Sequence, residues 1–369
     1  MQLEKNKSLI QHNTFGFDSC AEYFVEANNL SDAQEAIDYC KTQNHSLTIL
    51  GDGSNVVLTG DIPGVTLKMA ASNFFLNDKD GGSAGDSNSE DTINVIAEAG
   101  VNWHQFVLAT IERKAYGLEN LSLIPGTVGA APIQNIGAYG VEIASRLTFV
   151  ECIDCGTNQL QVFDNAACEF AYRDSLFKRS KPLEITSAES KSSIYLPRFL
   201  ITRVGFSLQR EFNAEMSYSA LSSELQKRGI ENPDAATVSE IVCQIRQSKL
   251  PDPATLGNAG SFFKNPVIGS SQKNDFQRQW PDAPCYPQAD GSTKVAAGWL
   301  VEKAGWKGRK VDGGRLGVHD KQALVLVNHG GGDGESLIRL ASNIQQSVFE
   351  KFGVQLEQEP RNLPLDLSA

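Results

Sequence analysis

The segment that most restricts how this chain can fold is 123–140, which reads LIPGTVGAAPIQNIGAYG. Repeated glycines and two prolines interrupt its small residues, so neither a regular helix nor a regular strand can run through it. Glycine lets the backbone come close to a bound molecule, because no Cβ stands between them. The sequence therefore predicts an irregular loop that lies against a ligand, with Gln134, Asn135 and Tyr139 as its possible specific contacts.

A second glycine segment, Gly51–Asn55, stands between two short apolar runs that are typical of strands. Its backbone N–H groups could bind a pyrophosphate, and Ser54 and Asn55 add side-chain donors. The segment has neither the spacing of a P-loop nor that of a dinucleotide-binding glycine motif. Alone it is better explained as a tight turn between strands. Together, the two glycine segments indicate an extended cofactor that contains a diphosphate.

Hydrophobic periodicity predicts an α+β protein with many short strands and no internal repeat. Ser31 and Asn102 are expected to cap helices, and Gly353 is expected to end the last one. The predicted helices begin near 31, 102 and 237, and a last one includes 337–352. The predicted strands are 47–50, 56–58, 93–97, 147–153, 200–208 and 354–359. Two polar stretches, 78–91 and 180–193, are predicted to be insertions without chemistry.

Length and charge narrow the possible partners of the protein. With 369 residues the chain should form two or three domains, and Leu250–Pro253 is the predicted boundary between two of them. A net charge of −11 disfavours broad binding to nucleic acid or to an anionic membrane. No apolar run is long enough to span a membrane, and the N-terminal residues lack the apolar run of a signal peptide. Seven cysteines do not suggest a secreted disulfide scaffold, so a reduced, cytoplasmic protein is expected.

Three polar positions are candidates for chemistry. Arg173 could grip a substrate carboxylate with its planar fork, or it could pair with Asp174, and the sequence does not choose between these roles. Ser261 does not lie in the nucleophile motif of esterases, which leaves proton donation or, more simply, the capping of a turn. Glu357 and Glu359 share the non-core face of the last predicted strand, where carboxylates usually contact solvent.

Neither a metal site nor a cysteine redox motif is expected. The pair Cys152 and Cys155 lies in a strand-like run with no second pair, which favours inert core or edge cysteines. The five histidines show no ligand spacing, so no metal site is predicted.

The order of the motifs closely resembles one family, the UDP-N-acetylenolpyruvoylglucosamine reductases (MurB) of bacterial cell-wall synthesis. The resemblance runs from Asn13 almost to the C-terminus, and the segments Tyr286–Gly291 and Ala297–Leu300 resemble the family's type I form, which has a tyrosine loop. The motifs that carry it are 49–56, 117–121, 124–126, 132–142, 172–175, 249–253 and 257–266.

This resemblance implies an FAD-binding fold of the vanillyl-alcohol-oxidase type, with two α+β subdomains and a smaller substrate-binding domain. The implied division is 1–70, completed by 355–369, for the first FAD subdomain, 71–250 for the second, and 251–354 for substrate. The implied reaction uses NADPH to reduce noncovalent FAD, which then reduces the enolpyruvyl ether of a UDP-sugar to UDP-N-acetylmuramate for peptidoglycan, and hence for cell shape and division. A flavin oxidase on the same fold and a flavin-free UDP-sugar-binding protein are the alternatives.

The resemblance also assigns roles to residues. Arg173 would stabilise charge on the substrate carboxylate, Ser261 would donate a proton to the α-carbon, and Glu359 would polarise the carboxylate. The implied substrate contacts are Tyr139, Tyr218, Lys249, Asn265, Tyr286 and Gln322. The implied FAD contacts are Gly51, Gly53, Ser54, Asn55, Pro125, Gly126, Gly129, Gln134, Gly137 and Arg246.

Overall fold

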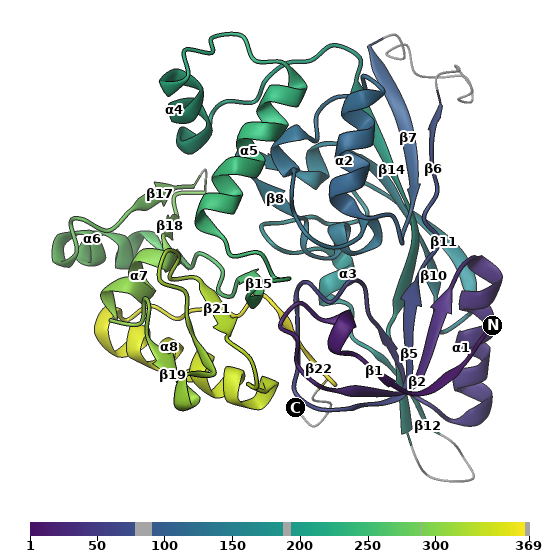
Figure 1. Cartoon of the computed structure of the whole chain (residues 1–369). Coiled ribbons are helices and arrows are strands. Elements are labelled where there is room, and N and C mark those ends of the chain that lie inside the picture. The colour runs from purple at the N-terminus through teal and green to yellow at the C-terminus, as the bar shows by residue number, and fades with distance from the viewer. Residues whose placement is uncertain (78–90, 187–192, 289, 366–369) are drawn as a thin grey trace. The chain divides into compact units, whose positions relative to one another are not determined.

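The computed structural model describes residues 1–77, 91–186, 193–288 and 290–365 (Figure 1). They form two compact units. Unit 1 comprises Met1–Lys7, Ala21–Asp52 and Ile62–Gln247, whereas unit 2 comprises Ser8–Cys20, Gly53–Asp61 and the chain from Ser248 onward. Residues 78–90 and 187–192 of the predicted polar insertions lie outside the described residues. The three-part domain division inferred above stays a prediction.

The first sheet of unit 1 is mainly parallel and carries one helix. Its strand order is β1 (Glu4–Ser8), β2 (Cys20–Ala27), β5 (Ile62–Met69) and β3 (Leu47–Ile49), with β5 parallel to both β2 and β3. Helix α1 (Leu30–Gln43) buries the predicted apolar stripe that contains Ala33 and Ile37. The expected cap at Ser31 is wrong: Asn29 is still extended and its side chain accepts the N–H of Asp32 at 2.9 Å, so the helix begins earlier.

A five-stranded antiparallel sheet forms the larger part of unit 1, in the order β11 (Gln159–Asp164), β10 (Leu147–Asp154), β14 (Phe199–Gln209), β7 (Thr92–Glu98) and β6 (Phe74–Asn77). Helix α2 (Trp103–Glu112) lies beside β7 and β14 in Figure 1. Its fully buried Trp103 and Phe106 pack with Phe206 of β14. Asn102 caps α2 as predicted, accepting the N–H of Gln105 at 3.1 Å.

Short elements fill the remainder of unit 1. The predicted irregular segment 123–140 contains a 3-10 helix, η3 (Val128–Gln134), and the first strand of a two-stranded turn, β8 (Gly137–Ala138) with β9 (Val141–Glu142). Unit 1 also contains the 3-10 helices η2 (Glu119–Leu121) and η4 (Ile143–Ser145), whereas η1 (Ile10–His12) belongs to unit 2. The remaining elements of unit 1 are α3 (Leu176–Arg179), β12 (Leu183–Thr186), β13 (Ser193–Leu196), α4 (Ser219–Lys227) and α5 (Ala235–Lys249), which ends where unit 2 resumes. Helices α4 and α5 share an apolar cluster that includes Leu221, Val242 and Ile245.

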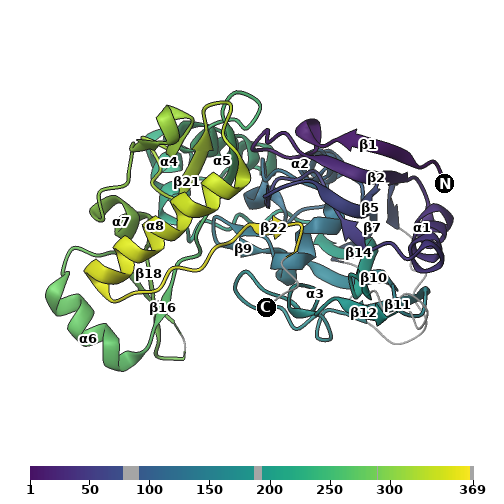
Figure 2. The same cartoon turned by 90° about the horizontal axis from the view of Figure 1, so that it is seen from below.

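Unit 2 contains a four-stranded antiparallel sheet in the order β15 (Gly257–Ser261), β21 (Val325–Asn328), β20 (Leu316–Val318) and β19 (Lys310–Val311). A three-stranded sheet orders β16 (Val267–Ile268), β18 (Thr293–Val295) and β17 (Cys285–Pro287). The other elements are α6 (Ser270–Gln279), α7 (Ala297–Lys303), η5 (Asp312–Gly314) and α8 (Gly334–Phe352). Helix α8, seen along its length in Figure 2, ends as predicted at Gly353, whose φ is 65°.

The end of the described chain differs from its predicted form. The strand expected over 354–359 is wrong, because only Gln358 forms a bridge, with Phe263. Pro360 lacks the N–H that would continue the ladder beyond Glu359. Beyond it, β22 (Arg361–Leu363) instead runs parallel to β4 (Val56–Leu58).

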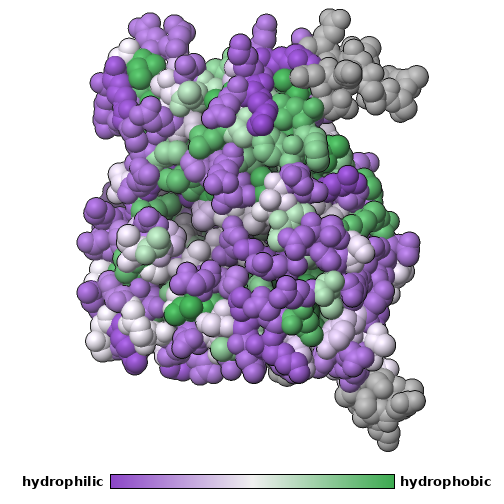
Figure 3. All heavy atoms as spheres, turned by 45° about the vertical axis from the view of Figure 1, so that its right-hand side comes forward, coloured by the Kyte–Doolittle hydropathy of each residue, from purple (hydrophilic) through white to green (hydrophobic). Residues whose placement is uncertain are grey.

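The face of the molecule drawn in Figure 3 is mostly hydrophilic, with apolar residues in separate groups. None of the helices in the described ranges is both long and apolar enough to cross a membrane.

Candidate functional site

Arg173 of unit 1 is fixed against the glycine-rich segment. Its Nη2 donates to the carbonyl of Gly137 at 2.7 Å, and its backbone adopts a left-handed conformation with φ 53°. The neighbouring Asp174 pairs with Arg179. The carboxylate of Asp174 already pairs with another cation, Arg179, so the structure favours a ligand-binding role for Arg173 over an Arg173–Asp174 pair.

Asn135 ties this turn to the glycine-rich segment. Its buried side chain donates to Oε2 of Glu142 at 2.8 Å and to the carbonyl of Ala171 at 3.1 Å, and it accepts the N–H of Ala144 at 3.1 Å. Fully bonded buried amides fix local geometry, since breaking any one bond leaves a polar atom unsatisfied. Asn135 therefore holds the turn before Arg173 in one place.

Two predicted substrate tyrosines meet in unit 1. The rings of Tyr139 and Tyr218 lie edge to face with centroids 5.2 Å apart. Tyr139 follows β8 with a φ of 48° and packs against the α4–α5 cluster, and burial raises the pKa of its phenol. Tyr218 stands at the start of α4 and is 46% exposed. A partly buried tyrosine ring and a half-exposed one thus lie in contact.

A cation without an acidic partner among the described residues lies near Tyr139. Arg246 of α5 donates from Nε to the carbonyl of Leu123 at 3.2 Å, and burial lowers the pKa of its guanidinium. No carboxylate in the described part of the chain pairs with it. His104 accepts the N–H of Leu123 at 3.0 Å, and burial followed by the charge of Arg246 lowers the pKa of its imidazole. A partly buried, unpaired guanidinium suits an anionic ligand group such as a phosphate, so this position fits the predicted cofactor.

The first glycine segment adjoins the second within unit 1. A Cβ on Gly51 would lie 3.6 Å from Oγ1 of Thr127 and 3.7 Å from the Cβ of Ala130, so Gly51 lies against segment 123–140. Gly129 already donates its N–H to Ala99 at 2.9 Å, and a Cβ there would stand 2.5 Å from that of Ala99. Gly129 therefore brings its backbone close to Ala99, while Gly51 is the glycine with ordinary space around it.

The remaining residues of the first glycine segment belong to unit 2. Gly53 has a φ of 65°, and a Cβ there would lie 2.0 Å from the carbonyl oxygen of His12. The carbonyl of Gly53 accepts the N–H of Thr14, and the carbonyl of Asn55 accepts the N–H of Arg361. Only glycine fits at position 53, where the backbone itself requires it.

Ser261 ends β15 and is exposed. A bulge precedes it, where Gly260 adopts a φ of 68° and Asn258 accepts the N–H of Gly260 at 2.9 Å. The same buried Asn258 donates to the carbonyls of Pro251 and Leu256, so the predicted turn-rich approach is fixed by one amide. None of the residues described here hydrogen-bonds the Ser261 hydroxyl, which leaves it open to a ligand.

Glu359 lies beside Phe262, the residue that follows Ser261 in the chain. Its N–H donates to the carbonyl of Phe262 at 2.8 Å. Glu357 is exposed and pairs with Lys264, whereas Glu359 is half-buried. The alternating pattern does not distinguish Glu357 from Glu359, but the structure does: of these two carboxylates, only that of Glu359 is partly shielded from solvent.

The other predicted substrate residues of unit 2 fall into two groups. Asn265 accepts the N–H of Ala297 at 2.9 Å, and Oε1 of Gln322 would lie 3.3 Å from a Cβ on Gly298, so both flank the first turn of α7. Tyr286 is 53% exposed on β17, and Lys249 is exposed at the end of α5.

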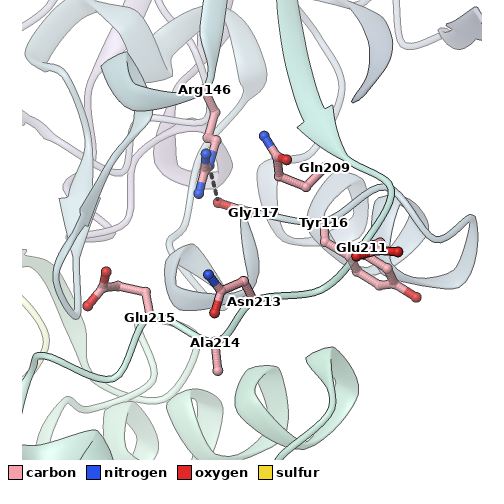
Figure 4. Close-up of a pocket in the computed structure, with 8 residues that line it drawn as sticks. All are labelled: Tyr116, Gly117, Arg146, Gln209, Glu211, Asn213, Ala214 and Glu215. Atoms are coloured by element: carbon pink, nitrogen blue, oxygen red, sulfur yellow. Dashed lines mark hydrogen bonds between the residues drawn. The ribbon is translucent and has the colours of Figure 1, made fainter. Parts of the chain in front are cut away.

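Sequence reasoning assigned no role to Asn120, Asn258 and His104, although each is bonded to a segment that carries a predicted residue. It also missed a pocket of about 230 Å³ in unit 1. Figure 4 shows its lining, with Nε of Arg146 donating to Gly117 at 3.4 Å while Glu211 and Glu215 bring acidic groups. No group of three potential metal ligands occurs in the described ranges.

Comparisons with known proteins give a consistent result. A family model for the UDP-N-acetylenolpyruvoylglucosamine reductase C-terminal domain matches residues 252–363, and a model for an FAD binding domain matches residues 21–162. The chain is 45% identical over 361 residues to the UDP-N-acetylenolpyruvoylglucosamine reductase of Pseudomonas fluorescens Pf-5, and 44% identical over 361 residues to that of Chromobacterium violaceum, with 98% of both chains covered in each case.

Among solved structures, the UDP-N-acetylenolpyruvylglucosamine reductase of Thermus caldophilus matches with a TM-score of 0.61 at 21% identity. The match covers 99% of this chain and 100% of that one, which shows a shared fold.

Proposed function

This chain belongs to the family of UDP-N-acetylenolpyruvoylglucosamine reductases, and we propose that it reduces the enolpyruvyl ether of UDP-N-acetylglucosamine enolpyruvate to UDP-N-acetylmuramate. The resemblance inferred from the motifs is confirmed, as is the α+β fold with an FAD-binding domain. The observation that carries the proposal is the match over 98% of the chain to relatives of that name. FAD is the cofactor and NADPH the reductant, so the protein is an oxidoreductase of peptidoglycan precursor synthesis.

Bound FAD supplies hydride transfer from NADPH to the β-carbon of the enol ether. Negative charge then develops on the substrate carboxylate, and a preorganised cation there stabilises the transition state. We assign this role to Arg173. The assignment is supported by its fixed position at Gly137 and by the separate pairing of Asp174.

Ser261 donates the proton that the α-carbon requires. Two observations support this role for Ser261. The residue is exposed and its hydroxyl has no protein partner among the residues described, and it follows a bulge that Asn258 holds in place. Serine is a weak acid, so a neighbouring group must assist it. We assign Glu359, which lies beside Phe262, to polarising the substrate carboxylate, a role in which the side chain of Glu359 itself is protonated.

The negative charge of the UDP-sugar guides the assignment of the residues that contact it. The diphosphate of the UDP-sugar needs cations and donors within a protein of net charge −11. We assign Lys249 and Tyr218 to that end of the substrate, and Tyr139, whose ring packs edge to face on that of Tyr218, is a further proposed substrate contact. Asn265, Tyr286 and Gln322 complete the proposed set.

We assign FAD binding to Arg246 and to the two glycine segments. Arg246 has the unpaired charge that the diphosphate or flavin requires. A Cβ on Gly51 would meet segment 123–140 only at ordinary contact distances, and that segment contains the further proposed contacts Pro125, Gly126, Gly129, Gln134 and Gly137. Gly53, Ser54 and Asn55 follow Gly51 directly in the chain.

Two measurements test the function. Acid precipitation of the purified yellow protein should release FAD into the supernatant, and NADPH oxidation should require the enolpyruvyl UDP-sugar. Flavin that stays with the pellet would contradict noncovalent binding, and NADPH oxidation that consumes oxygen without the UDP-sugar would instead indicate an oxidase. A cytoplasmic location stays a prediction, to be checked by cell fractionation.

A further inference from the structure

The motif Gly117–Leu121 has no role in the reaction described above, yet its asparagine joins two parts of the site. Asn120 is 3% exposed. Its Nδ2 donates to the carbonyl of Tyr139 at 2.7 Å and to the carbonyl of Glu215 at 2.9 Å. Both hydrogens of one amide group are therefore used on two segments that are far apart in sequence.

Each of these carbonyls belongs to a segment that carries a proposed substrate tyrosine. Tyr139 is itself held in a left-handed conformation, with φ 48°. Glu215 comes three residues before Tyr218, and its carboxylate accepts the N–H of Ser217 at 2.9 Å, which closes the turn that leads to Tyr218. The amide of Asn120 thus bridges the two chain segments whose rings meet 5.2 Å apart.

The segment that carries Asn120 is anchored independently of the tyrosines. The carboxylate of Glu119 accepts the N–H of Gly117 with both oxygens, at 2.8 and 2.9 Å. Trp103 donates from Nε1 to the carbonyl of Leu121 at 2.9 Å, and the hydroxyls of Ser122 and Ser239 share a hydrogen bond of 2.7 Å. A buried side chain on such a fixed segment sets the position of whatever it bonds.

We propose that Asn120 is a positioning residue that fixes the distance between Tyr139 and Tyr218 for the UDP-sugar. The proposal rests on the proposed substrate roles of these tyrosines. Asn120 touches neither substrate nor cofactor in this scheme and acts only through the two backbone carbonyls. Losing it removes the hydrogen bonds that join the Tyr139 turn to the 213–217 turn, and leaves only the apolar packing around Tyr139 to hold them, while the tyrosines themselves remain.

A buried asparagine can also serve stability alone, so the test needs a matched control. Asn165, also in unit 1, donates from Nδ2 to two backbone carbonyls, those of Ala144 and Leu147, at 2.8 and 2.7 Å. Asn165→Ala removes the same kind of bonds without touching either tyrosine segment. Asn120→Ser keeps one donor and is the milder variant should Asn120→Ala fold poorly.

The experiment compares these variants as purified holoenzymes, with melting temperature, FAD content, and kcat and KM for the enolpyruvyl UDP-sugar at saturating NADPH. We expect Asn120→Ala to raise KM roughly tenfold, from the loss of two hydrogen bonds, with a smaller change in kcat. Asn120→Ser should fall between it and the wild type. Asn165→Ala should lower the melting temperature while leaving KM unchanged.

Tyr139→Phe and Tyr218→Phe separate this proposal from the function on which it rests. If both leave KM unchanged, the substrate roles of the tyrosines are wrong. If they raise KM but folded Asn120→Ala and Asn120→Ser do not, the positioning role is overturned. If Asn120→Ala raises KM no further in the Tyr218→Phe background, the two residues act through one contact, as proposed.

Discussion

The backbone N–H of Glu359 donates to the carbonyl of Phe262 at 2.8 Å, and Phe262 follows Ser261 directly. A carboxylate and a hydroxyl separated by almost a hundred positions in the sequence are thereby attached to one pair of hydrogen-bonded segments within unit 2. The single bridge between Phe263 and Gln358 completes this pairing. The proposed proton donor Ser261 and the carboxyl group proposed to polarise the substrate, that of Glu359, are therefore held by the same pair of segments.

Ser261→Ala should spare the reduction of FAD by NADPH and slow the later reoxidation by the UDP-sugar. The proton transfer belongs only to the second half-reaction, and loss of one general acid typically costs about a hundredfold to ten-thousandfold in rate. Stopped-flow traces of flavin absorbance measure each half-reaction separately. Equal slowing of both halves would show that the serine is structural.

Arg173→Lys should lower kcat and kcat/KM together. Lysine keeps the charge but loses the planar fork, and an interaction made mainly in the transition state lowers both constants. Kinetic constants, FAD content and melting temperature should be measured on the same preparation. Normal kcat in a destabilised variant would remove Arg173 from the catalytic residues.

The glycines at 51 and 53 should respond differently to alanine. At Gly53 a Cβ would collide with the carbonyl of His12 at a positive φ, so Gly53→Ala should lower the free energy of unfolding by roughly 2 kcal/mol or more. At Gly51 a Cβ meets only ordinary contacts at 3.6 and 3.7 Å, so Gly51→Ala should leave the apoprotein stable and weaken FAD binding. Urea unfolding of the apoproteins and FAD titration measure the two effects. Equal loss of stability in both variants would contradict this reading of Gly51.

Cysteine reactivity should divide into two classes. Cys40, Cys152, Cys155 and Cys168 are buried, and burial raises the pKa of each thiol to about 12. A coloured thiol reagent at neutral pH should therefore label native Cys20, Cys243 and Cys285, which are partly exposed, and reach the others only after denaturation. Rapid labelling of Cys152 or Cys155 in the native protein would contradict the interpretation of that pair as inert.

Stability should fall as the solution becomes acidic below about pH 6.5, the ordinary pKa of histidine. Burial and Arg246 lower the pKa of His104 in the folded protein, so the unfolded chain takes up a proton first. This loss continues until the pH reaches the folded pKa, with a slope of at most about 1.4 kcal/mol per pH unit for one group. His104→Asn should reduce the slope. His319 and His329, whose pKa values burial also lowers, should supply what remains. If the free energy of unfolding in urea depends on pH in His104→Asn as it does in the wild type, His104 does not contribute to the loss of stability in acid.

Local patterns predicted the elements that local chemistry determines. The cap at Asn102 and the termination of α8 at Gly353 follow from side chains and φ preferences within one turn, and both are confirmed. The start of α1 was missed because Asn29 and Ser31 are both good caps, and only the backbone angles decide between them.

The site was predictable as a set of residues but not as an arrangement. The contact between Arg173 and Gly137 spans 36 positions, and no periodicity encodes it. Asn120 stands in a recognisable motif, yet its importance lies in which two carbonyls it bonds, and that depends on tertiary structure.

The pairing of β4 with β22 has a consequence for how the protein is made. Thr59 donates to the carbonyl of Leu363 across 304 positions of sequence. At a translation rate of about 5–20 residues per second, roughly 15–60 s pass on the ribosome between synthesis of the first strand and that of its partner. During that interval the 53–61 stretch has no β22 to pair with, so unit 2 is completed only after Leu363 has been synthesised.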